Sequence, residues 1–501
     1  MLLRTRASQL RKALDESTSY AQWAERAQEL DALTGMDLWR LENASEEYDY
    51  QLIRERLQQL RTFQQQPDLQ PLVRALREGL HHDLGNMGNP ALYYHSNFGT
   101  KKLIENYTAQ VCESLRFVAE HDVRNLSHER KMQFFKETAQ SFGQPALMLS
   151  GGATLGLFHI GVCKALHEQD LLPEVISGSS AGSLMAAMIG THTDAELQAL
   201  YNGDGFYMNA WNWKKWYRGL IGSGFADQVQ LERFLRSNIG EYSFEEAYLR
   251  TGRHINVTVS PVRMHQKPRL LNELTAPYLL VWSSVLASCA VPVIFPPVSL
   301  TTKDPDGHYV PYMPGQLWVD GSVKSDLPRT RLTHLYDVNF FIAVQVNPHI
   351  VPFLENDRER LERARLSSWP ARILREELKF HGTGIFNFLR HQFTHEASRQ
   401  LMDHAYSIIA QRYYGDVTIA PPRYTMDHYR HMLQNPSIEC WRWFCQQGER
   451  ATWPKLAMIR SHIQIARTLK ACIVLLENRR NRRSADHRND TRTPGSEAVH
   501  S

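Results

Sequence analysis

A serine between two glycines is the first candidate for chemistry in this sequence. The stretch EVISGSSAGSLMAAMIG, residues 174–190, places Gly178, Ser180 and Gly182 in a G-x-S-x-G frame between an apolar run and a run of small residues. In a nucleophile elbow, a serine at a tight strand-to-helix turn exposes its hydroxyl above the sheet, and small neighbours let strand and helix approach closely. The same letters also occur in flexible Gly/Ser loops. The two flanking runs favour the elbow, with Ser180 as a nucleophile.

A second candidate is the glycine-rich turn SGGATLG at residues 150–156, which follows the apolar run ALML. Acyl transfer needs hydrogen-bond donors aimed at a developing oxyanion, and adjacent glycines let backbone N–H groups point the same way. Phosphate binding is the alternative, but Leu157 and Phe158 stand where a P-loop needs Lys and Ser or Thr. The turn therefore predicts an oxyanion hole that uses Gly151, Gly152 and Ala153, with Gly156 completing the motif.

A serine nucleophile needs a base, and one carboxylate has a suitable setting. Asp320 ends the apolar run QLWV and is followed by Gly321. A carboxylate at a strand end beside glycine can project into a site at the carboxyl edge of a sheet. A plain Asp-Gly turn is an equally good interpretation of the local residues. The 22 histidines also leave a Ser–His–Asp triad open.

The sequence calls for no metal and no organic cofactor. Two histidine groups, His81-His82-Asp83 and His428 with His431, lack a complete ligand set. Exposed or packing histidines are therefore the better interpretation of both groups.

Alternation of apolar runs with helical patterns indicates the fold. The runs at 146–149, 255–261, 317–321 and 339–348 are typical of buried strands, and they predict an α/β domain with a central, mainly parallel sheet. Leucines at helical spacing predict packed helices before it. We expect a helical N-terminal region at 1–143, the α/β domain at 144–348, a helical C-terminal region at 349–478, and a basic, disordered tail at 479–501.

Composition bears on partners and location. A net charge of +4 over 501 residues gives no argument for a nucleic-acid partner. The N-terminus lacks the apolar segment of a secretion signal and the cysteines are scattered, so we expect a cytosolic protein with reduced thiols that is not secreted. The uncharged stretch 274–302 is long enough to cross a bilayer, but its prolines favour a buried helix followed by an irregular loop.

Two features bear on lipid. Several apolar residues of that stretch could line an acyl-chain groove, although most such residues are core: Trp282, Val285, Leu286, Val291, Ile294 and Phe295. Residues 354–379 have a helical pattern with nearly balanced charge, which favours a solvated helix over one that docks on anionic lipid.

The motifs, taken in order, resemble a known family. SGGATLGLFHIGV, GSSAGS and VDGSVKSDLP resemble motifs of the patatin-like phospholipases and acyl hydrolases over about 146–345, and ASCAVPVIFPPV at 287–298 resembles the apolar segment between their serine and aspartate. The helical N-terminal region and the variant glycine turn are more similar to the triacylglycerol lipase subfamily of yeast and plant oil bodies. That similarity reaches back to about Leu10.

The resemblance implies a patatin-like fold and a Ser–Asp dyad, with Ser180 as nucleophile, Asp320 as base, and Gly151 and Gly152 in the oxyanion hole. It implies hydrolysis of carboxylic esters of acylglycerols or phospholipids without a cofactor, and peripheral contact with a membrane or lipid droplet. A phospholipase A or lysophospholipase with the same site, or a non-catalytic lipid-surface scaffold, is the alternative. Three intact motifs speak against a scaffold.

Two departures from the family pattern matter. Leu155 stands where the glycine loop of patatins has arginine, so oxyanion stabilisation would rest on backbone groups. The H-x-x-x-x-D motif associated with acyltransferase activity in some lipases of the subfamily is absent from the sequence.

Overall fold

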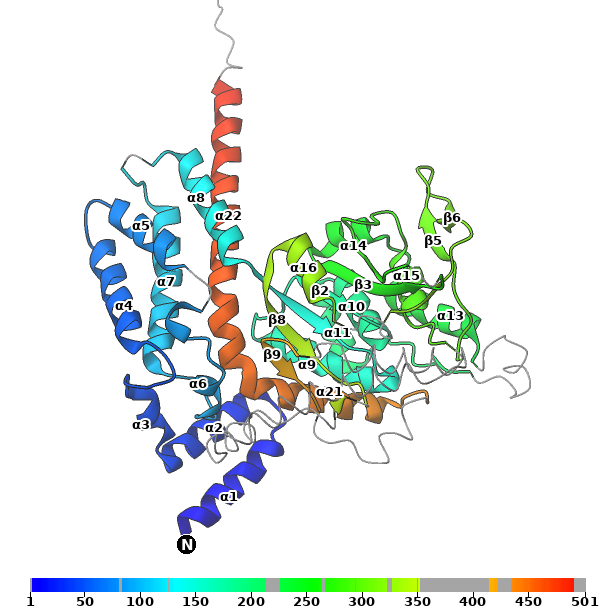
Figure 1. Cartoon of the computed structure of the whole chain (residues 1–501), viewed down its shortest axis with the longest axis horizontal. Coiled ribbons are helices and arrows are strands. Elements are labelled where there is room, and N and C mark those ends of the chain that lie inside the picture. The colour runs from blue at the N-terminus through cyan, green and yellow to red at the C-terminus, as the bar shows by residue number, and fades with distance from the viewer. Residues whose placement is uncertain are drawn as a thin grey trace, which may run out of the picture. The chain divides into compact units, whose positions relative to one another are not determined.

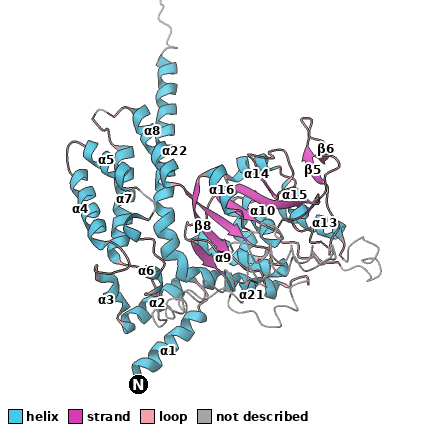
Figure 2. Ribbon diagram, in the orientation of Figure 1, coloured by secondary structure: helices cyan, strands magenta, loops and turns pink. Residues whose placement is uncertain are grey.

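The computed structural model describes residues 2–80, 83–124, 126–212, 226–263, 266–292, 294–321, 327–348, 350–351, 414–421 and 434–490. The chain forms two compact units. The sheet unit comprises Met1–Leu33 and Pro145–Ile459, and the helical unit comprises Thr34–Gln144 and Arg460–Ser501. Figures 1 and 2 show the helices and strands of both units.

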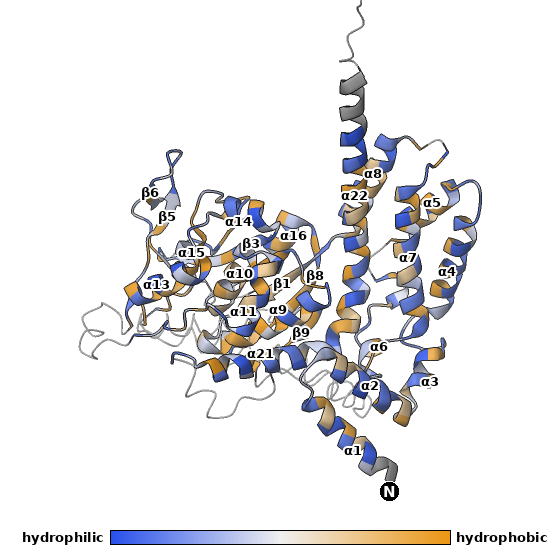
Figure 3. Cartoon of the chain, turned by 180° about the vertical axis from the view of Figure 1, so that it is seen from behind, coloured by the Kyte–Doolittle hydropathy of each residue, from blue (hydrophilic) through white to orange (hydrophobic). Residues whose placement is uncertain are grey.

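The helical unit is built from amphipathic helices. Its elements are α3 (Met36–Leu41), α4 (Tyr50–Gln64), α5 (Gln70–Gly79), η1 (Leu84–Asn86), α6 (Ala91–Tyr94), α7 (Lys102–Glu120), α8 (His128–Phe142) and most of α22 (Leu456–Asp490). The leucines predicted to pack are buried, because helical spacing places them on one face of α4 and α5. Hydrophobic and hydrophilic residues alternate along α4, α5 and α7 (Figure 3).

The tail expected to be disordered from 479 is helical as far as Asp490. Contacts within the helical unit account for this. Arg479 donates from Nη1 to the carbonyl oxygens of Ala119 and Glu120, at 3.0 and 3.1 Å, at the end of α7. A cation is favourable at a helix C-terminus, and a helix anchored in this way propagates at little further cost.

The unit boundaries also differ from the predicted regions. Residues before Thr34 belong with the sheet unit, although the sequence grouped 1–143 as one region. In the sheet unit, Arg450 donates from Nε to the Ser17 carbonyl oxygen at 2.8 Å, and the rings of Trp23 and Trp453 lie 6.4 Å apart. Contacts between residues this distant in sequence leave no local signal.

A sheet of seven described strands forms the core of the sheet unit. The strand order is β4-β3-β2-β1-β8-β9, with β7 paired to β3. β2 is parallel to β1 and to β3, and β9 is parallel to β8, whereas β4 and β7 are antiparallel to β3. The strands are β1 (Gln144–Leu149), β2 (Val175–Gly178), β3 (His254–Pro261), β4 (Arg269–Leu271), β7 (Trp318–Asp320), β8 (Val338–Val344) and β9 (Val417–Ile419). The predicted mainly parallel α/β fold is confirmed.

Helices pack around the sheet, and a separate hairpin consists of β5 (Leu300–Lys303) and β6 (Tyr309–Tyr312). α10 packs on β2 and β3, and α15 packs on β3 and β7. The remaining elements are α1 (Leu2–Asp15), α2 (Tyr20–Thr34), η2 (Ala153–Leu157), α9 (Phe158–Glu168), α10 (Ala181–Thr191), α11 (Asp194–Asn202), α13 (Gln228–Ile239), α14 (Phe244–Thr251), α15 (Val281–Ser288), α16 (Arg329–Tyr336), α21 (Ile438–Thr452) and η5 (Trp453–Lys455).

The uncharged stretch 274–302 contains the buried helix α15 followed by irregular chain, as predicted. Among the described residues, no helix is long and apolar enough to cross a membrane. The helix predicted at 354–379 and the histidines at 81, 82, 428 and 431 lie outside the described residues.

Candidate active site

Ser180 lies in the sharp turn between β2 and α10, with φ 51° and ψ −124°. A residue with a Cβ rarely adopts positive φ, and such outliers cluster at functional sites. Hydrogen bonds hold the turn: Ser183 donates from Oγ to the Ser180 carbonyl oxygen at 2.6 Å, and the Ser180 N–H donates to Ser288 Oγ at 2.9 Å. The hydroxyl-bearing residue is thus presented at the start of a helix, whose N-terminus favours negative charge.

The glycines on either side of Ser180 lie where the backbone segments touch. A Cβ at Gly178 would overlap the backbone of Gly182, and a Cβ at Gly182 would overlap the carbonyl oxygen of Leu149 at the end of β1. The start of α10 also lies close to the glycine turn, because a Cβ at Gly156 would lie 2.7 Å from Ala181 Cβ. Small residues in the motif therefore allow α10 to start directly on the ends of two strands.

Asp320 lies at the same edge of the sheet as Ser180. β7 pairs with the same side of β3 as β2, just beyond the end of β2: Gly178 pairs with Val257 and Asp320 pairs with Val259, while β4 pairs with the opposite side at both positions. Ser180 follows Gly178 by two residues, so strand register brings it level with Asp320. Asp320 is 2% exposed and Ser180 is 8% exposed, so both lie in a region with little water.

Cys289 is a further residue of the candidate site, and the sequence analysis missed it. Burial raises the pKa of the Cys289 thiol, and the negative charge of Asp320 raises it further, while side-chain hydrogen bonding with Ser183 and Ser180 opposes the shift. The thiol is therefore within hydrogen-bond reach of the Ser180 hydroxyl and within the electrostatic influence of the Asp320 carboxylate. A raised pKa keeps the sulfur protonated and weakly nucleophilic, because the thiolate is the reactive form.

Gly321, the other glycine predicted at the site, lies where the chain passes β3. A Cβ there would overlap the carbonyl oxygen of Thr258. A side chain at Gly321 would push the end of β7 away from β3, and it would displace Asp320 with it.

The glycine turn follows β1 directly and is fixed to the end of β8. Ser150 Oγ accepts a hydrogen bond from the Val346 N–H at 2.9 Å and donates to the Gly151 carbonyl oxygen at 3.0 Å. Gly152 has φ 157°, and a Cβ there would lie 2.6 Å from Val346 Cγ2. Ala153 also has positive φ, at 51°. Successive unusual backbone conformations of this kind can gather N–H groups into an anion-binding concavity.

His159, in the first turn of α9, supports this glycine turn. Its ring is fully buried, and Nε2 lies 2.9 Å from the Ser150 carbonyl oxygen. A carbonyl can only accept, so Nε2 carries the proton in this contact. Burial lowers the pKa of His159 to about 4, against a smaller opposing effect of that hydrogen bond. The neutral ring therefore contacts the turn through a donor.

The low pKa of His159 predicts a pH-dependent stability. The pKa falls from 6.5 in an exposed ring to about 4 in the folded chain. Between these values the unfolded chain binds a proton that the folded chain does not, so the free energy of unfolding should fall as pH drops from about 6.5 to 4. The slope is about 1.4 kcal/mol per pH unit, or about 3 kcal/mol in total.

Melting temperatures from pH 8 to pH 4 check this expectation. His159→Gln keeps a donor for Ser150 but does not titrate, so it should lose this part of the slope while keeping its activity at pH 7. If the melting temperature fell with pH equally steeply in wild type and variant, the expected effect of His159 would be contradicted. A folded His159→Gln protein without activity would restore a histidine to the catalytic unit.

The apolar residues considered for an acyl chain divide into three groups. Trp282 is engaged by polar partners: its Nε1 donates to Glu241 at 3.0 Å, and the Arg236 guanidinium lies 4.9 Å from the centre of its ring system. Val285, Leu286 and Phe295 are buried, as core residues are. Val291 and Ile294 are half-buried and closely follow Cys289. These two remain the candidates for contact with an acyl chain.

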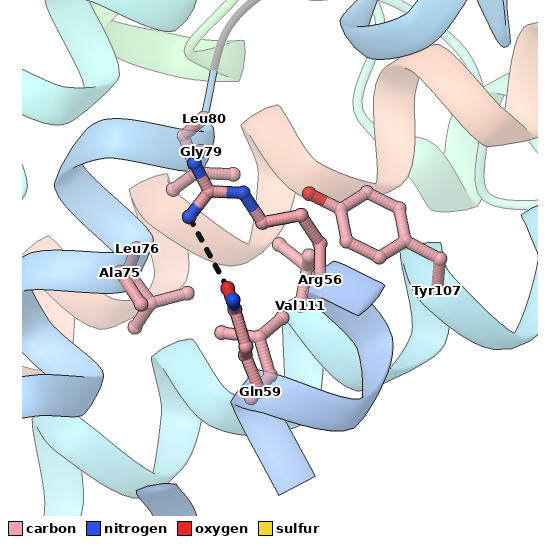
Figure 4. Close-up of a pocket in the computed structure, with 9 residues that line it drawn as sticks. Arg56, Gln59, Ala75, Leu76, Gly79, Leu80, Tyr107 and Val111 are labelled. Atoms are coloured by element: carbon pink, nitrogen blue, oxygen red, sulfur yellow. Dashed lines mark hydrogen bonds between the residues drawn. The ribbon is translucent and has the colours of Figure 1, made fainter. Parts of the chain in front are cut away.

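A hollow in the helical unit lies among α4, α5 and α7 (Figure 4). Arg56 donates from Nη1 to Gln59 Oε1 at 3.4 Å, and Gly79, Leu80 and Tyr107 complete this side of the lining. No nucleophile is paired with a base among the residues that line it. We assign it no part in the chemistry.

One described group has the composition of a metal site. Asp304, Asp306 and His308 lie close together at the turn of the β5–β6 hairpin. Asp304 Oδ1 accepts hydrogen bonds from the backbone N–H groups of Asp306, at 3.0 Å, and His308, at 2.8 Å. These hydrogen bonds are those of a turn, and they explain without a metal why the three residues lie close together.

Comparison with known proteins agrees with this architecture. A family model described as patatin-like phospholipase matches residues 147–332, and a model described as a domain of unknown function, DUF3336, matches residues 1–140. The chain is 34% identical to triacylglycerol lipase ptl3 of Schizosaccharomyces pombe, over 94% of this chain and 98% of that protein. The chain belongs to the patatin-like phospholipase family, as its motifs predicted.

Two further relatives are longer than this chain. It is 35% identical to triacylglycerol lipase SDP1L of Arabidopsis thaliana, over 95% of this chain and 60% of that protein. It is also 35% identical to triacylglycerol lipase 4 of Saccharomyces cerevisiae, over 89% of this chain and 50% of that protein. The predicted similarity to the lipase subfamily is therefore confirmed, and it includes the N-terminal region.

Proposed function

We propose that this chain is a serine hydrolase that cleaves carboxylic esters of lipids, with triacylglycerols as the first substrate class. The strained turn at Ser180, level with Asp320 on the same side of β3, is the observation that carries the proposal. Relatives named as triacylglycerol lipases support the substrate class.

In the first half of the proposed reaction, Ser180 Oγ attacks the ester carbonyl carbon while Asp320 accepts the hydroxyl proton. The carbonyl π electrons move to oxygen, and N–H groups of the turn at Gly151, Gly152 and Ala153 stabilise the oxyanion. As the carbonyl re-forms, the bond to the alcohol oxygen breaks and Asp320 returns the proton to the leaving alkoxide. The products are an acyl-Ser180 ester and a free alcohol.

In the second half, water attacks the acyl carbon and Asp320 accepts a proton from that water. Collapse of the second tetrahedral intermediate releases the fatty acid and returns the proton to Ser180 Oγ. A carboxylate is an ordinary base of low pKa, so it depends on its surroundings for this task. The burial of Asp320 supports the assignment, because a dry site strengthens a carboxylate's hold on a proton.

Two alternatives keep their place in the test. A phospholipase A or lysophospholipase would use the same residues on a different ester, and the name of the matching family model supports that option. A non-catalytic lipid-surface scaffold would need neither the strained serine nor the buried aspartate. Activity of the purified protein on a panel of triacylglycerols, diacylglycerols, phospholipids and lysophospholipids separates the three. Release of fatty acid mainly from triacylglycerol is expected, and no release from any lipid would leave the scaffold.

We also infer that the chain binds a lipid surface peripherally, as a protein that acts at a membrane or lipid droplet from the cytoplasm. Val262, Met313 and Leu317 are 45%, 42% and 44% exposed. The Val262 N–H donates to the Leu317 carbonyl oxygen at 3.1 Å, just beyond the pairing of β3 with β7. At about 3.3 Å per residue, these two lie about 10 Å further out along the strand than Asp320. We call Val262, Met313 and Leu317 the exposed apolar rim. The position of Val262 and Leu317 places this rim on the edge of the sheet that carries the candidate site.

The charge beside this rim suits an anionic surface. The connection from Val262 to Asn272 contains Arg263, Lys267 and Arg269 and no acidic residue. Arg269 also contacts the rim, because its Nη1 lies 3.4 Å from Met313 Sδ. Apolar side chains that enter the interface beside cations are the usual means of peripheral binding.

Replacing both Met313 and Leu317 with serine should weaken binding to anionic phospholipid vesicles at least about tenfold, because each buried aliphatic side chain contributes about 1–2 kcal/mol. Vesicle flotation measures the binding. Leu249→Ser is the control, since Leu249 is 77% exposed on α14, which leads into the opposite end of β3. Hydrolysis of a soluble short-chain ester should stay unchanged in all three proteins. Equal flotation of the double variant and wild type would contradict the rim.

A further inference from the structure

Ser288, the last residue of α15, connects Ser180 to the central sheet. Its Oγ accepts a hydrogen bond from the Ser180 N–H at 2.9 Å and donates one to the Thr258 carbonyl oxygen on β3 at 2.7 Å. The side chain is fully buried. One hydroxyl thus uses its donor and one acceptor position in a fixed direction, because its single proton is committed to the carbonyl.

Ala290, two residues after Ser288, binds the backbone of Asp320. The Asp320 N–H donates to the Ala290 carbonyl oxygen at 3.1 Å. The short segment Ser288–Ala290 therefore binds the backbone of Ser180 at one end and the backbone of Asp320 at the other. Cys289, between them in sequence, is within hydrogen-bond reach of the Ser180 hydroxyl.

We infer that Ser288 is a positioning residue, which holds the Ser180 backbone in its strained conformation and so sets the position of the Ser180 hydroxyl relative to Asp320. This inference rests on the proposed function of Ser180. Rotation of the peptide before Ser180 would relax φ from 51° and swing the hydroxyl away from the base. The hydrogen bond from the Ser180 N–H to Ser288 Oγ opposes that rotation directly, because the N–H belongs to that peptide.

α15 carries an internal control for this role. Ser284 is also fully buried, but its Oγ donates to the carbonyl oxygen of Leu280, the residue before the same helix, at 3.2 Å. Removal of either hydroxyl leaves a similar small void, and it removes one buried hydrogen bond at Ser284 and two at Ser288. Among these two serines, only Ser288 contacts the backbone of Ser180.

The experiment measures the second-order rate of inactivation by a fluorophosphonate, with the labelled residue mapped by mass spectrometry. For Ser288→Ala we expect labelling at Ser180 that is ten- to a hundredfold slower, because misplacement of a reacting group by about 1 Å costs up to this factor. Ester hydrolysis should show a fall in kcat with little change in KM. Ser284→Ala should react at the wild-type rate, even if its melting temperature falls as much as that of Ser288→Ala.

Ser288→Cys separates the hydrogen bond from the volume it fills. It nearly preserves the side-chain shape but offers only a weak acceptor, so it should be slow like Ser288→Ala. It also serves as the test if Ser288→Ala does not fold. Wild-type rates in whichever Ser288 variant folds would overturn the positioning role and leave the proposed function intact. A wild-type protein that is not labelled at Ser180 would overturn the proposed function, and the positioning role with it.

Discussion

Replacing Ser180 with alanine should lower ester hydrolysis by a factor on the order of 10⁴ to 10⁶, because the acyl group then has no oxygen to which it can be transferred. The fold should persist. Alanine keeps the Cβ and the backbone N–H that donates to Ser288 Oγ, so the turn loses only the hydroxyl. Hydrolysis of an emulsified triacylglycerol and of a soluble short-chain ester should both be lost, while KM for any residual rate changes little.

A melting temperature within a few degrees of wild type is the control for this variant. Binding to lipid vesicles should also remain, since Ser180 is 8% exposed and contributes little outer surface. Substantial hydrolysis by folded Ser180→Ala would place the nucleophile elsewhere in the chain.

Asp320→Asn should be nearly as severe, with a loss on the order of 10³- to 10⁴-fold in kcat. The amide matches the carboxylate in shape but cannot take the proton from Ser180. The backbone hydrogen bond from residue 320 to Ala290 and the pairing with Val259 do not involve the side chain, so β7 should stay in place. The loss should therefore appear without a matching loss of stability.

A double variant tests whether the two residues act as a unit. Ser180→Ala combined with Asp320→Asn should be no slower than Ser180→Ala alone, because the members of one catalytic unit are not additive. Independent, multiplied losses would contradict a dyad. An Asp320→Asn protein with most of its activity would point to another base.

Local signals explain why much of the sheet unit could be predicted from the sequence. β1, β2, β3 and β8 are short apolar runs followed by turn residues, and a buried parallel sheet requires this pattern. The glycines around Ser180 could be recognised because their spacing reflects contacts within a few residues, where a Cβ would overlap the next backbone segment. Fold and elbow thus come from short-range constraints.

The missed residues depend on packing between distant segments. Ser288 lies 108 positions beyond Ser180, and α15 also contains the buried serines Ser283 and Ser284, so nothing local distinguishes Ser288. Cys289 enters the site for the same reason, as the next residue after a helix that packs on β3 and β7. The division into units also escaped prediction, because contacts between α2 and η5, or between α7 and α22, join the two ends of the chain.

Substitution of Gly152 is a poor test of the oxyanion hole, because a Cβ there would collide with Val346 before any catalytic effect could be separated. Covalent labelling of the nucleophile is the most direct test of the proposed function. Wild-type protein treated with a fluorophosphonate should gain a single adduct, which peptide mass spectrometry should map to Ser180. Hydrolysis should be lost in proportion to labelling. Ser180→Ala should gain none. An adduct on any other residue that accounts for the lost activity, or full activity after Ser180 is labelled, would contradict the assignment of Ser180 as the nucleophile.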